Sequence, residues 1–191
     1  MAHISILGTG TMGRALAGLL AKGGHHVQSL GRTDTDEAVT GDIVILAVPY
    51  ASLAPIAATR GDELAGKVVV DISNPVNFET FDGLTVPADS SAAAEFAAAV
   101  PSARVVKAFN TNFGATLASG VVGDHATAVL LASDHDDAKE LLAGALAGAG
   151  VRAVDAGRLA RARELEALGF LQITLAASET ISWTGGFALV P

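Results

Sequence analysis

Ile4-Ser-Ile-Leu7-Gly8-Thr-Gly10-Thr-Met-Gly13 is a short apolar run that passes directly into a glycine-rich turn. A helical pattern begins inside this turn and continues to Lys22, with its apolar side chains on one face. At this spacing the first glycine permits a tight turn, the second lets the backbone approach a pyrophosphate, and the third lets the helix pack closely on the strand. The free N–H groups of the helix N-terminus also attract phosphate. We therefore expect a dinucleotide site formed by Gly8, Thr9, Gly10, Thr11, Met12 and Gly13; the alternative is that the glycines serve only a tight turn.

Short apolar runs bounded by Gly, Pro, Asn or Asp alternate with helical patterns along the rest of the chain. The apolar runs predict strands at 4–7, 26–30, 43–48, 68–72, 105–109 and 127–132, with a weaker one at 151–154. The helical patterns lie at 11–22, 50–58, 91–100 and 134–146. Such alternation is typical of βαβ units. The expected fold is α/β, a Rossmann-like doubly wound parallel sheet over residues 1–157 that is followed by a C-terminal helix and tail at 158–191.

The composition excludes several classes of protein. The 191 residues are 50% hydrophobic and carry a net charge of −8, which disfavours binding to nucleic acid or to an anionic membrane. Cysteine is absent, so disulfides, thiolate nucleophiles and Cys-ligated metals are excluded. The longest uncharged run, 43–59, is too short for a membrane span, and the N-terminus lacks the pattern of a secretory signal. We expect a cytoplasmic protein that takes any redox chemistry from an organic cofactor.

Two clusters contain residue types that can bind a metal. His25-His26 lies between a glycine pair and a predicted strand, and is interpreted as a solvated turn. Asp134-His-Asp-Asp137 opens a predicted helix, where acidic side chains are favoured by the helix dipole without any metal. We therefore expect no metal site.

The end of the second predicted strand indicates which dinucleotide is bound. An NAD site usually has Asp or Glu there to hold the ribose 2′-hydroxyl, whereas this chain reads Ser29-Leu-Gly31-Arg32-Thr33. A guanidinium group matches a 2′-phosphate, so Arg32 favours NADP(H). We expect Gly31, Arg32 and Thr33 to contact the cofactor. The alternative is a solvated loop arginine, and the acidic residues at 34, 36 and 37 would weaken phosphate binding.

Ligands of open α/β sheets bind outside the carboxyl ends of the strands. The residues that follow the predicted strands are therefore expected to contact the cofactor: Val48, Pro49, Tyr50, Asn74, Pro75, Ala108 and Phe109. Tyr50 and Phe109 are equally plausible as core residues. Asn110 and Thr111 are the candidate catalytic residues, because the amide of Asn110 can hydrogen-bond a nicotinamide or a second ring. Residues 73–90 form a long aperiodic segment that is a candidate lid or pocket wall.

Several of these stretches resemble the coenzyme F420-dependent NADP oxidoreductase family, which is itself similar to the reductase domain of the STEAP metalloreductases. The resemblance covers the glycine motif and the stretches Asp42–Tyr50, Val70–Pro75, Val106–Thr111 and Asp155–Gly157 with the helix that follows. It implies a doubly wound sheet with terminal helices and hydride transfer between NADP(H) and a small-molecule partner, coenzyme F420 or FMN. The family's matching position also supports the role of Asn110.

One segment departs from the family pattern. The family places a helix and another strand where this chain has only about nine residues, between Arg32 and Gly41. Such a segment can cross to a parallel neighbour but cannot form a βαβ unit. We therefore expect the sheet to lack one outer strand on the adenosine side.

The C-terminal helical pattern, from Arg158 to about Glu179, becomes apolar on nearly every side after Glu166. A helix of this kind is buried against two partners, so we expect a homodimer formed through it; folding back over its own sheet is the alternative. Two other functions remain open. One is an NADP(H)-binding redox sensor without turnover. The other is an imine reductase similar to pyrroline-5-carboxylate reductase, whose Gly-x-Gly-x-Met-Gly opening is shared.

Overall fold

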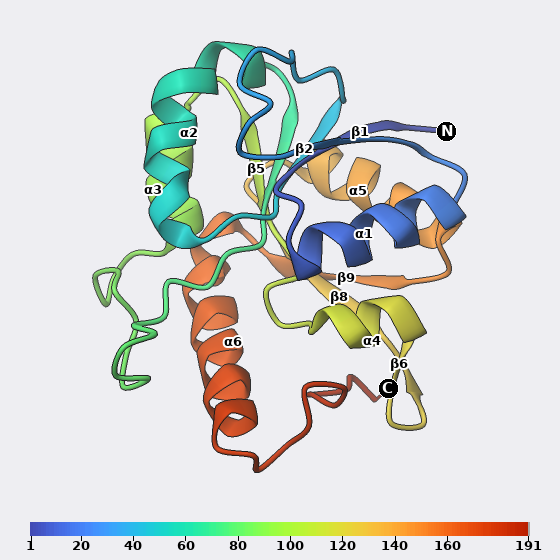
Figure 1. The fold of residues 1–191 in the computed structure, drawn as a ribbon, viewed down its shortest axis with the longest axis vertical. Helices are drawn as coiled ribbons and strands as arrows, with labels where there is room; N and C mark the ends of the chain where they lie inside the picture. Colours follow the sequence, from blue (N-terminus) through green and yellow to red (C-terminus); the bar gives the residue numbers. More distant parts are fainter. Residues whose placement is uncertain (191) are drawn as a thin grey trace.

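Seven strands form one sheet in the order β2-β1-β3-β4-β5-β8-β9 (Figure 1). The computed structural model describes residues 1–190. The first five strands in this order are parallel to one another. This arrangement confirms a Rossmann-like α/β fold. The strands are β1 His3–Leu7, β2 His26–Leu30, β3 Ile43–Leu46, β4 Val68–Asp71, β5 Arg104–Lys107, β8 Ala128–Ala132 and β9 Arg152–Gly157.

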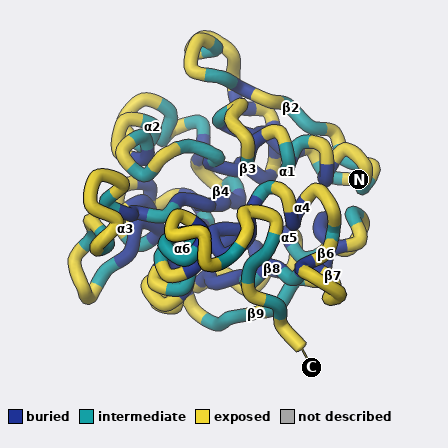
Figure 2. The backbone as a smooth tube through the Cα atoms, turned by 60° about the horizontal axis from the view of Figure 1, so that its bottom comes forward, coloured by how far each residue is buried: buried dark blue, intermediate teal, exposed yellow. Residues whose placement is uncertain are grey.

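Helices cover both faces of the sheet, as the alternating apolar pattern predicts. Ile43 and Ile45 of β3 pack in the cluster that contains α1 and α5, whereas Val44 and Leu46 pack in the cluster of α2 and α3. Figure 1 shows the two helix layers, and Figure 2 shows β3 and β4 buried between them. The helices are α1 Thr11–Lys22, α2 Leu53–Arg60, α3 Ala92–Ala99, α4 Gly114–Ser119, α5 Asp136–Gly148 and α6 Ala162–Ala177, with short 3-10 turns η1 Tyr50–Ser52, η2 Gly61–Leu64 and η3 Leu159–Arg161.

The sheet ends at β2 and lacks one outer strand there, as expected. The common dinucleotide-binding order has a further strand outside this position, whereas β2 pairs only with β1 in the described part of the chain. Residues 31–42 connect β2 to β3 without a helix or strand. The connecting loop therefore stands where a βαβ unit would otherwise enclose the adenosine end of a dinucleotide.

The last two strands correct the prediction of an all-parallel sheet. β8 is antiparallel to β5, and the two overlap at the single pair Lys107 and Ala132. Residues 108–127 connect the two strands through the short α4 and a hairpin, β6 Val121–Val122 and β7 His125–Ala126. This connection does not carry the chain back to the start of β5. β8 therefore approaches from beyond the carboxyl end of β5, and β9 follows parallel to β8.

Of the two histidines expected in a solvated turn, His26 is exposed, whereas His25 is half-buried and hydrogen-bonded. Nδ1 of His25 accepts a hydrogen bond from the amide of Ala2 at 3.1 Å. Its Nε2 lies 3.0 Å from the carbonyl oxygen of Ala145. His25 therefore connects the ends of β1 and α5. The acidic run at 134–137 does open α5, with Asp136 and Asp137 in the first turn.

The C-terminal helix α6 leaves the sheet and packs against α3 and the loops after β4 and β5 (Figure 1). One side of it is buried, including Gly169 and Gln172, while Leu171 on the other side is 49% exposed. The tail after α6 folds back, so that the Trp183 and Phe113 rings lie 5.0 Å apart. Over residues 1–190, none of the helices has the length and apolar character needed to span a bilayer.

Candidate nucleotide-binding site

The glycine turn between β1 and α1 has the geometry that a pyrophosphate site requires. Gly8 has φ of +114°, and a Cβ there would lie 2.1 Å from the carbonyl oxygen of Ala47. A Cβ on Gly13 would lie 1.9 Å from the carbonyl oxygen of Gly8. Gly10, in contrast, has no atom within 4 Å of its Cβ position. It caps α1 without a side-chain hydrogen bond, so the first N–H groups of the helix remain available to an anion.

A pocket of about 450 Å³ opens beside this turn. It lies between the carboxyl ends of β1, β2 and β3 and the helix α2. Seven of the predicted cofactor residues line it: Gly8, Thr9, Gly10, Gly31, Arg32, Val48 and Pro49. The other wall comes from α2 and its approach, with Ser52, Pro55, Ile56, Thr59 and Arg60, together with Thr35 of the loop. Sequence reasoning missed this second wall, because nothing in the α2 pattern indicates that its polar side faces a pocket.

Arg32 stands at the mouth of the pocket, on the exposed start of the loop 31–42. Within residues 1–190 its guanidinium has no hydrogen bond or ion pair. The nearby carboxylate of Asp34 accepts a hydrogen bond from the Gly31 amide at 2.7 Å, so its negative charge is partly offset. Thr33 is exposed and does not line the pocket.

Thr11, Met12 and Gly13 form the first turn of α1 and lie outside the pocket lining. Tyr50 is directed to the neighbouring helix α3, where its hydroxyl donates to Oε2 of Glu95 at 2.6 Å. This hydrogen bond, together with burial, raises the pKa of Tyr50 to about 12. Tyr50 thus lines a separate cavity of about 190 Å³ between α2 and α3.

The remaining predicted residues gather at the carboxyl ends of β4 and β5, under α6. The side-chain nitrogen of Asn110 donates to Oδ1 of Asn74 at 2.9 Å and to the carbonyl oxygen of Leu165 at 2.8 Å. Asn74 in turn donates to the carbonyl oxygen of Asn110 at 2.8 Å. Both hydrogens of the Asn110 amide are therefore used, and its Oδ1 is the atom left to accept. The carbonyl oxygen of Thr111 accepts from Gln172.

Phe109 joins β5 to this pair through a strained turn. Its φ is +61°, and the backbone N–H of Asn110 donates to the carbonyl oxygen of Ala108 at 2.8 Å across it. A positive φ is uncommon for a bulky residue, and such strain is often found at functional sites. The side chains of Ala108 and Phe109 are fully buried, as is most of Pro75. These residues do not line the pocket at the glycine turn, and their cofactor contacts stay a prediction.

The loop 73–90 does not line that pocket either. It is closed by a bridge between Val76 and Leu84. Phe78 and Phe81 at its tip pack edge to face, 5.7 Å apart, and are both exposed. Its role as a lid stays a prediction.

A buried ionic cluster lies beside the Asn74–Asn110 pair. Nζ of Lys107 lies 2.7 Å from Oδ2 of Asp71 and 2.8 Å from Oε1 of Glu166, and it donates to the carbonyl oxygen of Ser73 at 2.6 Å. All three charged side chains are fully buried. Burial raises the pKa of Glu166, although Lys107 opposes the shift.

Sequence reasoning did not predict this cluster. The available signal was a charged residue directly after an apolar strand run, at Asp71 and at Lys107, since Lys and Asp are almost never fully buried unless paired. Glu166 gave no such signal, because it follows several other charged residues. Glu166 also accepts from the amide of Ala92 at 3.0 Å, at the start of α3. The cluster therefore fixes α6 and α3 against the carboxyl ends of β4 and β5.

Comparison with known proteins places this geometry in a family. Residues 29–75 match the family described as NADP oxidoreductase, coenzyme F420-dependent. The F420-dependent NADP reductase of Methanocaldococcus jannaschii is 31% identical over 163 residues, which cover 82% of this chain and 72% of the relative. The metalloreductase STEAP3 of Rattus norvegicus is 33% identical over 184 residues, covering 86% of this chain. The chain spans only 36% of that longer relative.

A solved structure has the same architecture along the whole chain. It is that of a candidate F420-dependent NADP reductase from Arthrobacter sp. FB24, with a TM-score of 0.84, 27% identity and coverage of 100% of both chains. Sequence, fold and the glycine-turn geometry agree. The chain belongs to the F420-dependent NADP reductase family, a family of NADP-dependent oxidoreductases.

Proposed function

We propose that this protein binds NADP(H) in the pocket beside the glycine turn and transfers hydride between it and a deazaflavin of the F420 type. The observation that carries the proposal is that Gly10 and Arg32 line the same pocket of about 450 Å³. Gly10 leaves open space at the start of α1, where a pyrophosphate is favoured by free N–H groups. Arg32 supplies a guanidinium at the adenosine end that has no partner within residues 1–190, which suits a 2′-phosphate.

The nicotinamide end is proposed to lie toward the carboxyl ends of β4 and β5, where Asn110 and Thr111 follow the buried strand. The Asn110 amide is held by Asn74 and by the backbone of α6, so its free Oδ1 has a fixed position. That oxygen can accept a hydrogen bond from a carboxamide N–H. The positive φ of Phe109 turns the chain between the end of β5 and Asn110.

Hydride transfer between two rings needs positioning more than acid or base groups, because the cofactor carries the chemistry. NADPH supplies a hydride and becomes NADP⁺, the oxidised partner gains that hydride, and a proton from solvent completes its reduction. The protein's contribution is to hold one ring against the other and exclude water. FMN is the second candidate acceptor.

A panel of acceptors tests the proposal. NADPH oxidation is followed by absorbance with F420, FMN, a ferric chelate and a cyclic imine in turn. We expect turnover with F420, or more slowly with FMN, and none with the cyclic imine. Tight NADPH binding without turnover on any acceptor would contradict the proposal and favour a redox sensor. Turnover with the imine alone would favour an imine reductase.

The exposed side of α6 supports a second part of the proposal, a homodimer. Leu171 and the tail residue Trp183 are both about half exposed on the C-terminal segment, and large exposed apolar patches are uncommon on monomers. A two-fold mate would cover them, since closed dimers are the commonest oligomers. Sedimentation at micromolar concentration should give twice the chain mass; a monomer with full activity would contradict the dimer.

A further inference from the structure

The loop 31–42 owes its shape to a residue of another element, Arg60 at the end of α2. Nη2 of Arg60 donates to the carbonyl oxygens of Asp34 at 2.7 Å and Thr35 at 3.1 Å. Its Nη1 donates to the carbonyl oxygen of Glu37 at 2.8 Å. One guanidinium thus binds three backbone carbonyls of a loop that has no helix or strand of its own.

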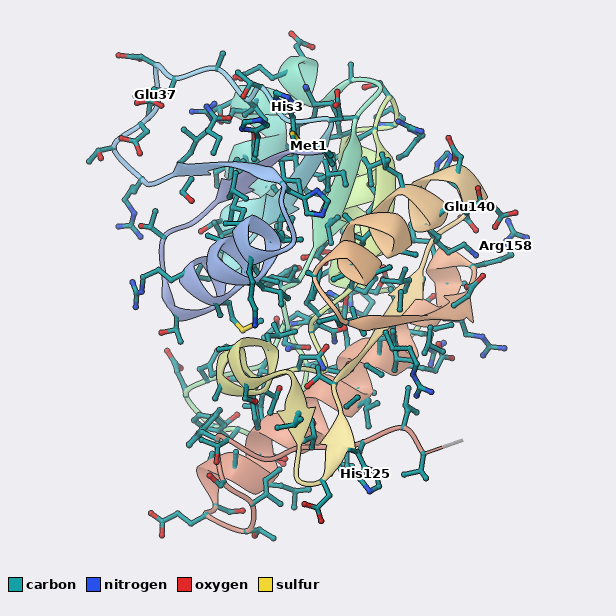
Figure 3. The ribbon with its side chains drawn as sticks, turned by 90° about the vertical axis from the view of Figure 1, so that its right-hand side faces the viewer. Met1, His3, Glu37, His125, Glu140 and Arg158 are labelled. Carbon is teal, nitrogen blue, oxygen red and sulfur yellow. The ribbon has the colours of Figure 1, made fainter. Side chains whose placement is uncertain are left out.

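Glu63 of η2 completes this contact. Its Oε2 lies 3.3 Å from Nη1 of Arg60 and accepts a hydrogen bond from the Val39 amide at 2.8 Å. The Arg60 side chain is only 12% exposed, so its charge is satisfied by these groups rather than by water. Figure 3 shows the Glu37 side chain directed away from the molecule at the outer bend of the loop. Arg60 therefore holds the backbone of the loop and not its acidic side chains.

The loop that Arg60 holds is the one that presents Arg32. Asp34 links the two: its carbonyl oxygen accepts from Arg60, and its carboxylate accepts from the Gly31 amide, next to Arg32. Arg60, Thr35 and Arg32 also line the same pocket. A loop that is already ordered in its binding conformation loses less entropy when the ligand binds.

We propose that Arg60 is a positioning residue that sets the preference for NADPH over NADH by holding the Gly31–Arg32 turn at the ribose 2′-phosphate. The inference rests on the proposed function, because it takes NADP(H) to bind in this pocket. Arg60 orders this loop in place of the helix and strand that the shortened segment lacks. We expect that lysine cannot replace it, because an ammonium donates from a single atom, whereas the guanidinium reaches Glu37 with Nη1 and both Asp34 and Thr35 with Nη2.

Calorimetric titration of NADPH and NADH tests this with Arg60→Ala, Arg60→Lys, Arg32→Ala and the double variant Arg60→Ala/Arg32→Ala. The matched control is Arg158→Ala, an exposed arginine far from the loop (Figure 3). Both Arg60 variants should weaken NADPH about tenfold and NADH less than about threefold. When Arg32 is already replaced by alanine, Arg60→Ala should weaken NADPH binding by no more than about a further twofold. The reason is that a residue that acts through Arg32 has no effect once Arg32 is absent.

Equal losses for NADPH and NADH, or full additivity with Arg32→Ala, would overturn the positioning role. So would Arg60 variants with normal affinity for NADPH. If Arg60→Ala does not fold, as judged by circular dichroism, Arg60→Lys gives the same comparison. Failure of the proposed site looks different, because Arg32→Ala would then leave NADPH binding unchanged. If Arg32→Ala weakens NADPH as expected and Arg60→Ala leaves the NADPH affinity unchanged, only the positioning role of Arg60 is overturned.

Discussion

Nζ of Lys107 lies 2.8 Å from Oε1 of Glu166, and both side chains are excluded from solvent. Because Asp71 also pairs with this nitrogen, one ammonium compensates two carboxylates. The cluster joins β4, β5 and α6 beside the Asn110–Leu165 hydrogen bond. The geometry at the carboxyl ends of these strands therefore depends on a buried ionic contact between distant parts of the chain.

Lys107→Met should lower the free energy of unfolding by about 3–5 kcal/mol, because it leaves buried carboxylates without their counter-charge. Chemical denaturation measures this. Lys22→Met is the matched control at an exposed helix position and should change stability by less than about 0.5 kcal/mol. A loss for Lys107→Met as small as that of the control would show that the cluster is not needed for folding.

Glu166→Gln should change how stability depends on pH. The pKa of Glu166 is raised in the folded protein, so the folded state holds this proton more tightly than the unfolded state does. The resulting stability is present below the ordinary Glu pKa of about 4.3, and it is lost as pH rises through the raised value. Denaturation at a series of pH values should show this fall in the parent protein and not in the variant. Parallel curves for the two proteins would contradict it.

Arg32→Ala should weaken NADPH about 10- to 150-fold, the range for losing a charge-assisted contact worth roughly 1.5–3 kcal/mol. NADH has no 2′-phosphate, so its affinity should hardly change. Calorimetry with both nucleotides measures the difference. Equal losses would rule out the 2′-phosphate role.

Gly10→Val should abolish binding of either nucleotide while the fold survives. Its Cβ position has no atom within 4 Å, so the new side chain meets only the space left for phosphate. Gly18→Val is the matched control, since Gly18 lies on α1, the helix that Gly10 caps, and also has open space at its Cβ position. Thermal unfolding and titration of the same samples separate stability from binding. Retained nucleotide binding in Gly10→Val would mean that the loop is only a turn.

The local part of the site could be predicted from the sequence, because its cause is local. Gly8 and Gly13 are required by backbone contacts within the turn and with the next strand, and the spacing of the glycines records that requirement. Arg32 lies two residues after β2 and lines the pocket, where its place in the sequence leads us to expect it. Its contact with a 2′-phosphate stays a prediction. The missing outer strand followed from chain length alone, since residues 31–42 can cross to the parallel strand β3 but are too few to add a helix and a further strand.

The rest depends on contacts between distant residues. Lys107 and Glu166 meet only after β5 and α6 are packed, and neither local pattern specifies a partner. The contact of Arg60 with the loop 31–42 is of the same kind. The expected parallel sheet did not include an antiparallel β8, because an apolar run suits a strand of either direction. The path through α4 and the β6–β7 hairpin, which brings the chain into β8 at the carboxyl end of β5, cannot be read from that run.

Deuterium transfer tests the central claim most directly. NADPH that carries deuterium at both hydrogen positions of the nicotinamide C4 is incubated with the protein and oxidised F420. The reduced deazaflavin is then examined by mass spectrometry. Direct hydride transfer places the label on a ring carbon of the deazaflavin, which does not exchange it rapidly with water. The account predicts one deuterium in the product, carried over from one face of the nicotinamide. An unlabelled product, or no reduction by a protein that binds NADPH tightly, would contradict it.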